Sequence, residues 1–283
     1  YDTEENTLFA KFKMQPSMAW NLAVYGEIGD RELDNFDIPP DGGTGMIPFF
    51  IANRQREQLG ALIEYLPNHQ WSFGARAEYN RDDYDPEQDI FVEIGLLETE
   101  TPSLTLDTSY HPSKDITTYI YYTREEVNSK QRNPGTASLS GPEPWEANID
   151  DTMDTIGIGG KFAGLGKWDL GLDLTYNKSK GQIDITDLSS STTNPYPELK
   201  TYLRSLKLWA EYHQGKNLVY RLSYWYEDYE ADNWAVDDLE ADSLVGLPPP
   251  PPAPGVTNYL LTGEDTLDYD VHVIGVSLVY QFQ

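Results

Sequence analysis

The sequence of 283 residues has no cysteine, few cations and no long apolar run. Without cysteine, the chain cannot carry a disulfide framework, a cysteine-ligated zinc ion, an iron–sulfur cluster or a covalently attached c-type haem. Lys and Arg number 20 against 47 Asp and Glu, and the net charge of -27 argues against nucleic acid as a partner. No stretch approaches the roughly 18 apolar residues of a transmembrane helix. A membrane β-barrel remains open, because its apolar residues alternate with polar ones.

Apolar and polar residues alternate over many segments of the chain. Between positions 206 and 212, Leu206, Leu208, Ala210 and Tyr212 share one face, and Lys207, Trp209 and Glu211 share the other. The alternation resumes after a short turn and continues from 218 to 227. A period of two predicts β-strands with one apolar and one polar face.

Five short segments with Pro, Gly or Asn join such strands in pairs, as hairpin turns do. They lie at 15–17, 67–69, 111–114, 164–167 and 213–216. Longer polar segments separate one hairpin from the next, and we expect outer loops there. These loops lie near 28–54, 80–100, 126–150, 181–198 and 231–265.

Aromatic residues lie beside the short turns. Tyr65, Tyr110 and Tyr212 come just before a turn, and Trp20, Trp71 and Trp168 come just after one. An amphipathic ring at the end of an apolar stripe prefers a membrane–water interface. A soluble β-sandwich is the alternative. Strands of ten or more residues, short turns alternating with long loops, and charged residues in mid-strand favour the barrel.

The last segment alternates up to a near-terminal aromatic residue. Ile274, Val276, Leu278, Tyr280 and Phe282 share one face. An aromatic residue that closes the last strand is typical of bacterial outer-membrane barrels, whose assembly machinery reads it. We therefore interpret Tyr280 and Phe282 as an assembly signal, and expect the chain in the lipid bilayer of a bacterial outer membrane.

The predicted fold is all-β: one antiparallel up-and-down transmembrane barrel domain over residues 1–283. We count about 11 strands, or 12 if residues 90–97 form a separate strand. Short turns of such barrels face the periplasm, so the first strand starts outside and the last ends inside. An odd number of strands starting outside cannot close alone. Since the chain also begins at Tyr1 without a signal peptide, we expect a mature chain or a fragment, most simply the C-terminal portion of a larger barrel.

The sequence offers little for catalysis or metal binding. His69, His111 and His213 fall in short turns, and His272 falls on the apolar face of the last strand. They look too dispersed for a metal cluster, and we expect no carboxylate and serine beside any of them. We therefore predict no enzyme, with no catalytic, cofactor-binding or metal-binding residue. The acidic run that begins at Asp228 and Glu230 favours a solvated loop over a Ca²⁺ site.

The polar faces of the strands, which would line the barrel lumen, are the predicted working surface. Its charged members are Arg76, Glu78, Asp107, Lys161, Asp173, Lys207, Arg221 and Glu227. They would pair with a polar protein inside the barrel, or line a water-filled pore. Gly157, Gly159 and Gly160 would leave space against an occupant of the lumen.

Several segments from 145 to 282 occur in the order found in one known family. They are DTMDTIGIG at 151–159, LGLDLTY at 170–176, GQID at 181–184, YPEL at 196–199, YWYEDY at 224–229, DNWAVD at 232–237 and YDVHVIGVS at 269–277. In these segments the chain resembles the MtrB/PioB family of porin–cytochrome electron conduits. Upstream of residue 145, only the hairpin rhythm agrees.

The resemblance implies a non-catalytic barrel that sheathes and positions a periplasm-derived multihaem c-type cytochrome for extracellular electron transfer. The haem c belongs to that partner, and an outer-surface cytochrome would dock above. The alternative is an outer-membrane porin with an open aqueous lumen for small solutes. The family's N-terminal half is absent here, together with the cysteine pair that some members carry, and the proline run at 248–252 is unexpected.

Overall fold

The computed structural model describes residues 2–33, 52–84, 95–133, 144–215, 217–233 and 268–280. They form strands, as the alternation predicts. The strands are β1 (Thr3–Ser17), β2 (Trp20–Leu33), β3 (Arg54–Tyr65), β4 (Trp71–Asp83), β5 (Gly95–Ser113), β6 (Ile116–Asn133), β7 (Trp145–Leu165), β8 (Trp168–Asp187), β9 (Thr192–Pro195), β10 (Leu199–Gln214), β11 (Leu218–Asp232) and β12 (Tyr269–Tyr280). Within these ranges, no helix has the length and apolarity needed to span a membrane.

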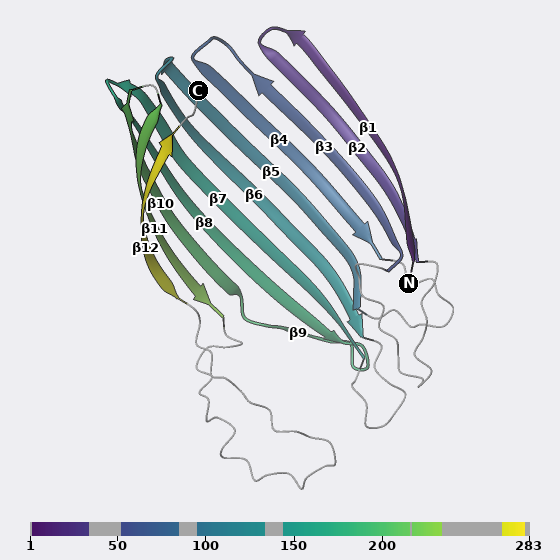
Figure 1. Cartoon of the computed structure of the whole chain (residues 1–283). Coiled ribbons are helices and arrows are strands. Elements are labelled where there is room, and N and C mark those ends of the chain that lie inside the picture. Colours follow the sequence, from purple (N-terminus) through teal and green to yellow (C-terminus); the bar gives the residue numbers. More distant parts are fainter. Residues whose placement is uncertain are drawn as a thin grey trace, which may run out of the picture.

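All strands belong to one antiparallel sheet in which neighbours along the chain are neighbours in space. The order is β1-β2-β3-β4-β5-β6-β7-β8-β10-β11-β12, and the short β9 pairs only with β8. Figure 1 shows this sheet curving strongly, with β1 and β12 as its two edges. The all-β up-and-down fold is therefore confirmed, and the unclosed sheet is consistent with part of a larger barrel. The twelfth strand is β9, because residues 95–97 continue into β5.

The five short turns gather at one end of the sheet, the upper end in Figure 1. β1 runs toward this turn end, and β12 also finishes there, where Tyr280 pairs with Leu218. We call the other end of the sheet, away from the five short turns, the loop end. Gly164, Gly166 and Gly215 adopt φ values of 75°, 72° and 76°, which suit glycine in tight turns. The first and last strands thus both run toward the short turns, as the sequence predicts; that the turns face the periplasm stays a prediction.

The strands reach further toward the loop end than the sequence predicts. β6 extends to Asn133 and β7 begins at Trp145, inside the loop expected near 126–150. β8 continues to Asp187, and β9 lies within the loop expected near 181–198. Apolar alternation stops earlier, but backbone pairing needs no apolar side chains. The Thr186 and Thr193 hydroxyl oxygens, 3.0 Å apart, continue the ladder with polar contacts. Residues 1, 34–51, 85–94, 134–143, 216, 234–267 and 281–283 lie outside the described part, among them Phe282 of the predicted assembly signal.

The register joins the apolar positions into one continuous face. Ile158, for example, pairs with Ile120 on one side and Leu174 on the other. These side chains have no cover: Leu8 is 67% exposed and Val276 is 80% exposed. A soluble sandwich would bury such a face against a second sheet. An apolar face left open along the whole sheet suits contact with lipid.

Aromatic rings border the apolar face at the turn end. Trp20 and Tyr65 stack with ring centroids 4.3 Å apart, and Trp71 and Tyr110 stack at 4.4 Å. Trp168 meets Tyr212 at 4.9 Å. Each pair joins residues directly opposite in register. The aromatic residues beside the turns therefore lie in pairs at one end of the apolar face, where the sequence places them.

Ion pairs border the same face at the loop end. Arg124 lies 2.8 Å from Glu126 and 3.5 Å from Asp154, measured between nitrogen and oxygen. Arg204 lies 2.5 Å from Asp228 and 2.9 Å from Glu230. The two acids belong to β11, so their assignment to a loop is wrong: they are paired residues of a strand. Positions 237–242 of the acidic run lie outside the described residues.

Candidate functional site: the polar face of the sheet

The register places the predicted lumen residues on a single face, opposite the apolar one. Directly opposed residues of an antiparallel pair project from the same side. Asp173 faces Gly159 on β7 and Lys207 on β10, and Lys207 faces Trp225 on β11. By the same pairing, the polar face holds all eight charged candidates: Arg76, Glu78, Asp107, Lys161, Asp173, Lys207, Arg221 and Glu227. Their contact with a partner stays a prediction.

Where β2 and β4 contribute to the polar face, the charged candidates Arg76 and Glu78 form an ion pair with each other and hydrogen bonds with Tyr25. Arg76 Nη2 lies 2.8 Å from Glu78 Oε1 and 3.4 Å from the Tyr25 hydroxyl. Tyr25 donates a hydrogen bond to Glu78. Lys11 Nζ lies 5.2 Å from the centre of the Tyr25 ring, on its neighbouring strand. This part of the wall is polar, and its charges are compensated internally.

On β7 to β11, cations lie over tryptophan rings. Lys161 Nζ is 5.8 Å and the Arg221 guanidinium 5.2 Å from the Trp209 ring centre. Lys207 Nζ is 4.8 Å from the Trp225 ring centre. The indole N–H of Trp225 donates to Ser205 over 3.0 Å. Such cation–π contacts hold the long cationic side chains along the wall.

Glycines on the polar face lie beneath aromatic rings of the adjacent strand. The ring–glycine pairs are Tyr25 with Gly60, Tyr119 with Gly159, Tyr121 with Gly157, and Trp209 with Gly171. A Cβ added to Gly171 would lie 2.1 Å from Trp209 Cε2, and one added to Gly157 would lie 2.3 Å from Tyr121 Cε1. The rings therefore lie flat against the backbone.

These pairs correct the interpretation of the glycines on β7. Gly157 and Gly159 do not leave open space for an occupant of the lumen, because Tyr121 and Tyr119 fill it. Gly160 belongs to the apolar face, where it pairs with Thr118 and Leu172. The sequence could not show these pairs, because each joins strands of different hairpins, whose register the short turns do not set.

His213 has neighbours that the sequence prediction missed. Its Nε2 lies 3.2 Å from Asp169 Oδ2, and Glu211 offers a third donor, with the three ligand atoms within 4.8 Å of one another. The dispersal of the histidines therefore does not rule out a metal cluster at His213, because its other possible ligands are carboxylates. Asp169 and His213 are far apart in sequence but meet where β8 pairs with β10. His272 lies on the apolar face as predicted, 2.8 Å from the Tyr224 hydroxyl.

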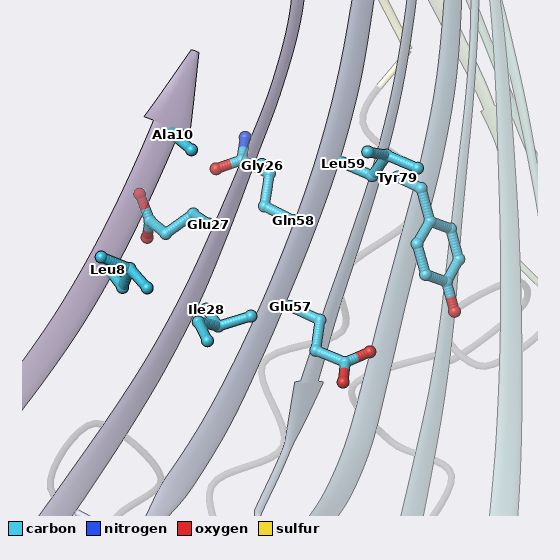
Figure 2. Close-up of a pocket in the computed structure, with 9 residues that line it drawn as sticks. All are labelled: Leu8, Ala10, Gly26, Glu27, Ile28, Glu57, Gln58, Leu59 and Tyr79. Carbon is cyan, nitrogen blue, oxygen red and sulfur yellow. The ribbon is translucent and has the colours of Figure 1, made fainter. Parts of the chain in front are cut away.

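A hollow of about 530 Å³ lies on the apolar side of β1 to β4. Figure 2 shows Leu8, Ile28, Leu59 and Tyr79 around the small residues of β1 and β2, Ala10 and Gly26. The small side chains leave this space between larger ones. Because it opens on the apolar face, lipid chains suit it better than a polar ligand does.

Comparisons with known proteins agree with this architecture. The family model described as outer membrane beta-barrel porin, MtrB/PioB, matches residues 1–282. The match thus extends upstream of residue 145, where only the hairpin rhythm indicated the family. "Outer membrane protein MtrB" of Shewanella baltica (strain OS185) is 26% identical over 285 residues, covering 99% of this chain and 38% of that protein. The chain thus spans well under half of this curated relative.

Solved structures with a similar fold are large outer-membrane barrels. The ferric citrate transporter FecA has a TM-score of 0.61 at 11% identity, and the match covers 100% of this chain and 40% of the FecA chain. The ferripyoverdine receptor of Pseudomonas aeruginosa has a TM-score of 0.59 at 11% identity, with coverages of 100% and 39%. The copper transporter OprC has a TM-score of 0.59 at 12% identity, with coverages of 100% and 43%. At these identities, the likeness concerns the fold alone.

Proposed function

This chain belongs to the MtrB/PioB family of outer-membrane β-barrels, and we propose that its wall sheathes and positions a multihaem c-type cytochrome for electron transfer across the outer membrane. The cytochrome enters from the periplasm, and a second cytochrome docks at the outer surface. All haem c belongs to these partners, since this chain has no cysteine to attach it. The barrel itself is non-catalytic: it insulates and orients.

The proposal rests on the shape of the polar face, where the large side chains lie against the sheet and project little from it. Four of its rings lie over glycines, and its cations Arg76, Lys161, Lys207 and Arg221 lie beside rings or a carboxylate. A wall of this kind is polar, yet offers a smooth surface against which a folded protein can pack. Interfaces of this sort combine aromatic surface with satisfied polar groups.

An open porin is the rival function. The family description uses the word porin, and a polar wall with satisfied hydrogen bonds also suits water. The two functions differ in what fills the lumen. A cytochrome excludes most water and contributes a haem spectrum, whereas an open pore conducts ions.

Purification from the native membrane in mild detergent tests the proposal. We expect a Soret absorbance band to co-elute with the barrel, because a retained cytochrome is the only source of haem in such a complex. A colourless barrel that conducts ions in a planar bilayer would refute the sheath and establish the porin. The haem partner is then identified by mass spectrometry of the coloured fraction.

A further inference from the structure

We propose a divalent metal site of the zinc class on the polar face at the turn end, with Asp169, Glu211 and His213 as ligands. Asp169 is the second residue of β8, and the other two lie near the end of β10. All three are next to short turns, so an ion can reach them from the periplasm. All three ligands belong to this chain, so the site needs no contribution from the proposed cytochrome.

The pairing of β8 with β10 sets two carboxylates against each other. Asp169 is directly opposite Glu211, an arrangement of like charges that destabilises a sheet unless it is compensated. His213 contacts Asp169 at 3.2 Å, and Arg221 Nη1 lies 3.6 Å from Glu211 Oε1. A divalent cation between the carboxylates would compensate both charges at one point.

The distances suit a small transition metal. Zinc lies about 2.0–2.2 Å from nitrogen and oxygen ligands, which in a tetrahedral site places neighbouring ligand atoms about 3.4 Å apart. Asp169 and His213 already have this spacing, at 3.2 Å. All three donors lie within 4.8 Å, so a small rotation of Glu211 away from its loose contact with Arg221 completes the set.

The donors also select the type of ion. One imidazole nitrogen with two carboxylate oxygens suits Zn²⁺ and related ions, whereas Ca²⁺ and Mg²⁺ prefer oxygen donors alone. The side chains of Asp169, Glu211 and His213 are 19%, 24% and 39% exposed, which leaves room for water at a fourth position. A bound ion would tie the turn ends of β8 and β10 together.

Zinc titration of the purified outer-membrane protein by calorimetry tests the site. We expect one ion per chain, with affinity reduced at least tenfold in Asp169→Asn and in His213→Gln. The matched control is His111→Gln, since His111 also lies beside a short turn but its Nδ1 contacts Thr117 at 3.0 Å. It should bind like wild type. Excess Ca²⁺ should not displace the zinc. Heat-modifiable gel migration verifies that each variant is folded.

In the calorimetry, either of two results would overturn the proposal: a wild-type protein that binds no Zn²⁺, or a folded Asp169→Asn variant that binds as wild type does. X-ray absorption at the zinc edge gives a reading that needs no variant. We expect one imidazole in the coordination shell of the loaded wild-type protein. A shell of oxygen ligands alone would place the ion on other carboxylates and refute this site.

Discussion

At the scale of single residues, the polar face is shaped by glycines that have no side chain to displace the ring above them. Trp209 lies on Gly171 in this way, and the ring also contacts Lys161 and Arg221. One glycine thus sets the position of a ring and of two cations. A methyl group at position 171 would displace the Trp209 ring and make it project further from the sheet.

Gly171→Ala should lift the Trp209 ring from the wall. The new Cβ would lie 2.1 Å from ring carbon, and overpacking of this kind costs about 1–3 kcal/mol. We expect a lower free energy of unfolding in urea and a shifted tryptophan emission. Gly26→Ala is the control, because its Cβ would meet only the Gln58 carbonyl oxygen at 3.3 Å. Equal effects of the two substitutions would contradict the ring–glycine account.

Asp187, at the end of β8, has a carboxylate that accepts hydrogen bonds from Ser189 and Ser190. The side-chain hydroxyls lie at 2.6 and 2.7 Å, and with the backbone N–H of Ser189 they lower the pKa of Asp187 to about 2. Because the pKa is lowered, the ionised carboxylate stabilises this turn fully at pH values above 3.8, the ordinary pKa of an aspartate. The stabilisation is lost as the pH falls toward 2.

Carboxyl NMR titration of Asp187 should therefore show a midpoint near 2 in the folded protein. In Ser189→Ala the midpoint should rise, because the first of the hydroxyl donors is removed. A wild-type midpoint at the ordinary value would mean that the serines do not hold the carboxylate in solution.

At the scale of strands, sequence alternation predicted both faces and all five hairpins. It succeeded because each residue's side follows from its position alone. It did not predict that Asp169 meets His213, or that Tyr121 covers Gly157, because these contacts depend on the register between strands. It also ended β8 too early, since a strand beyond the membrane pairs through its backbone without an apolar face.

Leu208→Arg should impair insertion of β10. Leu208 lies on the apolar face between Leu172 and Tyr224, and an arginine facing lipid near the midplane costs about 2–4 kcal/mol. Folding into lipid vesicles, followed by heat-modifiable gel migration, measures the loss. Thr175→Arg on the polar face is the control. If both variants insert as well as wild type, β10 does not present Leu208 to lipid.

At the scale of the whole molecule, the sheet separates an apolar outside from a charged inside. Lys207 and Arg221 lie on the inner face, whereas Lys180 and Lys200, directly opposite each other, lie on the outer face. The two pairs carry the same charge on neighbouring strands. They therefore allow a matched test of which face meets the cytochrome.

Replacing Lys207 and Arg221 with Glu should reduce the haem absorbance retained per barrel severalfold, because it reverses two charges on the proposed contact surface. Replacing Lys180 and Lys200 with Glu makes the same change in net charge on the other face, and should leave retention unchanged. Retention that is equal in the two double variants would remove Lys207 and Arg221 from the contact.

The length of the strands has a consequence at the cell surface. β7 has 21 residues, which at about 3.4 Å each extend about 70 Å, or about 50 Å along the membrane normal at a tilt of about 45°. The hydrocarbon core is only about 30 Å thick. With the turns near the periplasmic interface, about 20 Å of wall extends beyond the hydrocarbon core, through the headgroups and past them, as a rim. An antibody or a bacteriophage that approaches the cell would therefore touch this rim, and the ion pairs along it, before it reached the membrane.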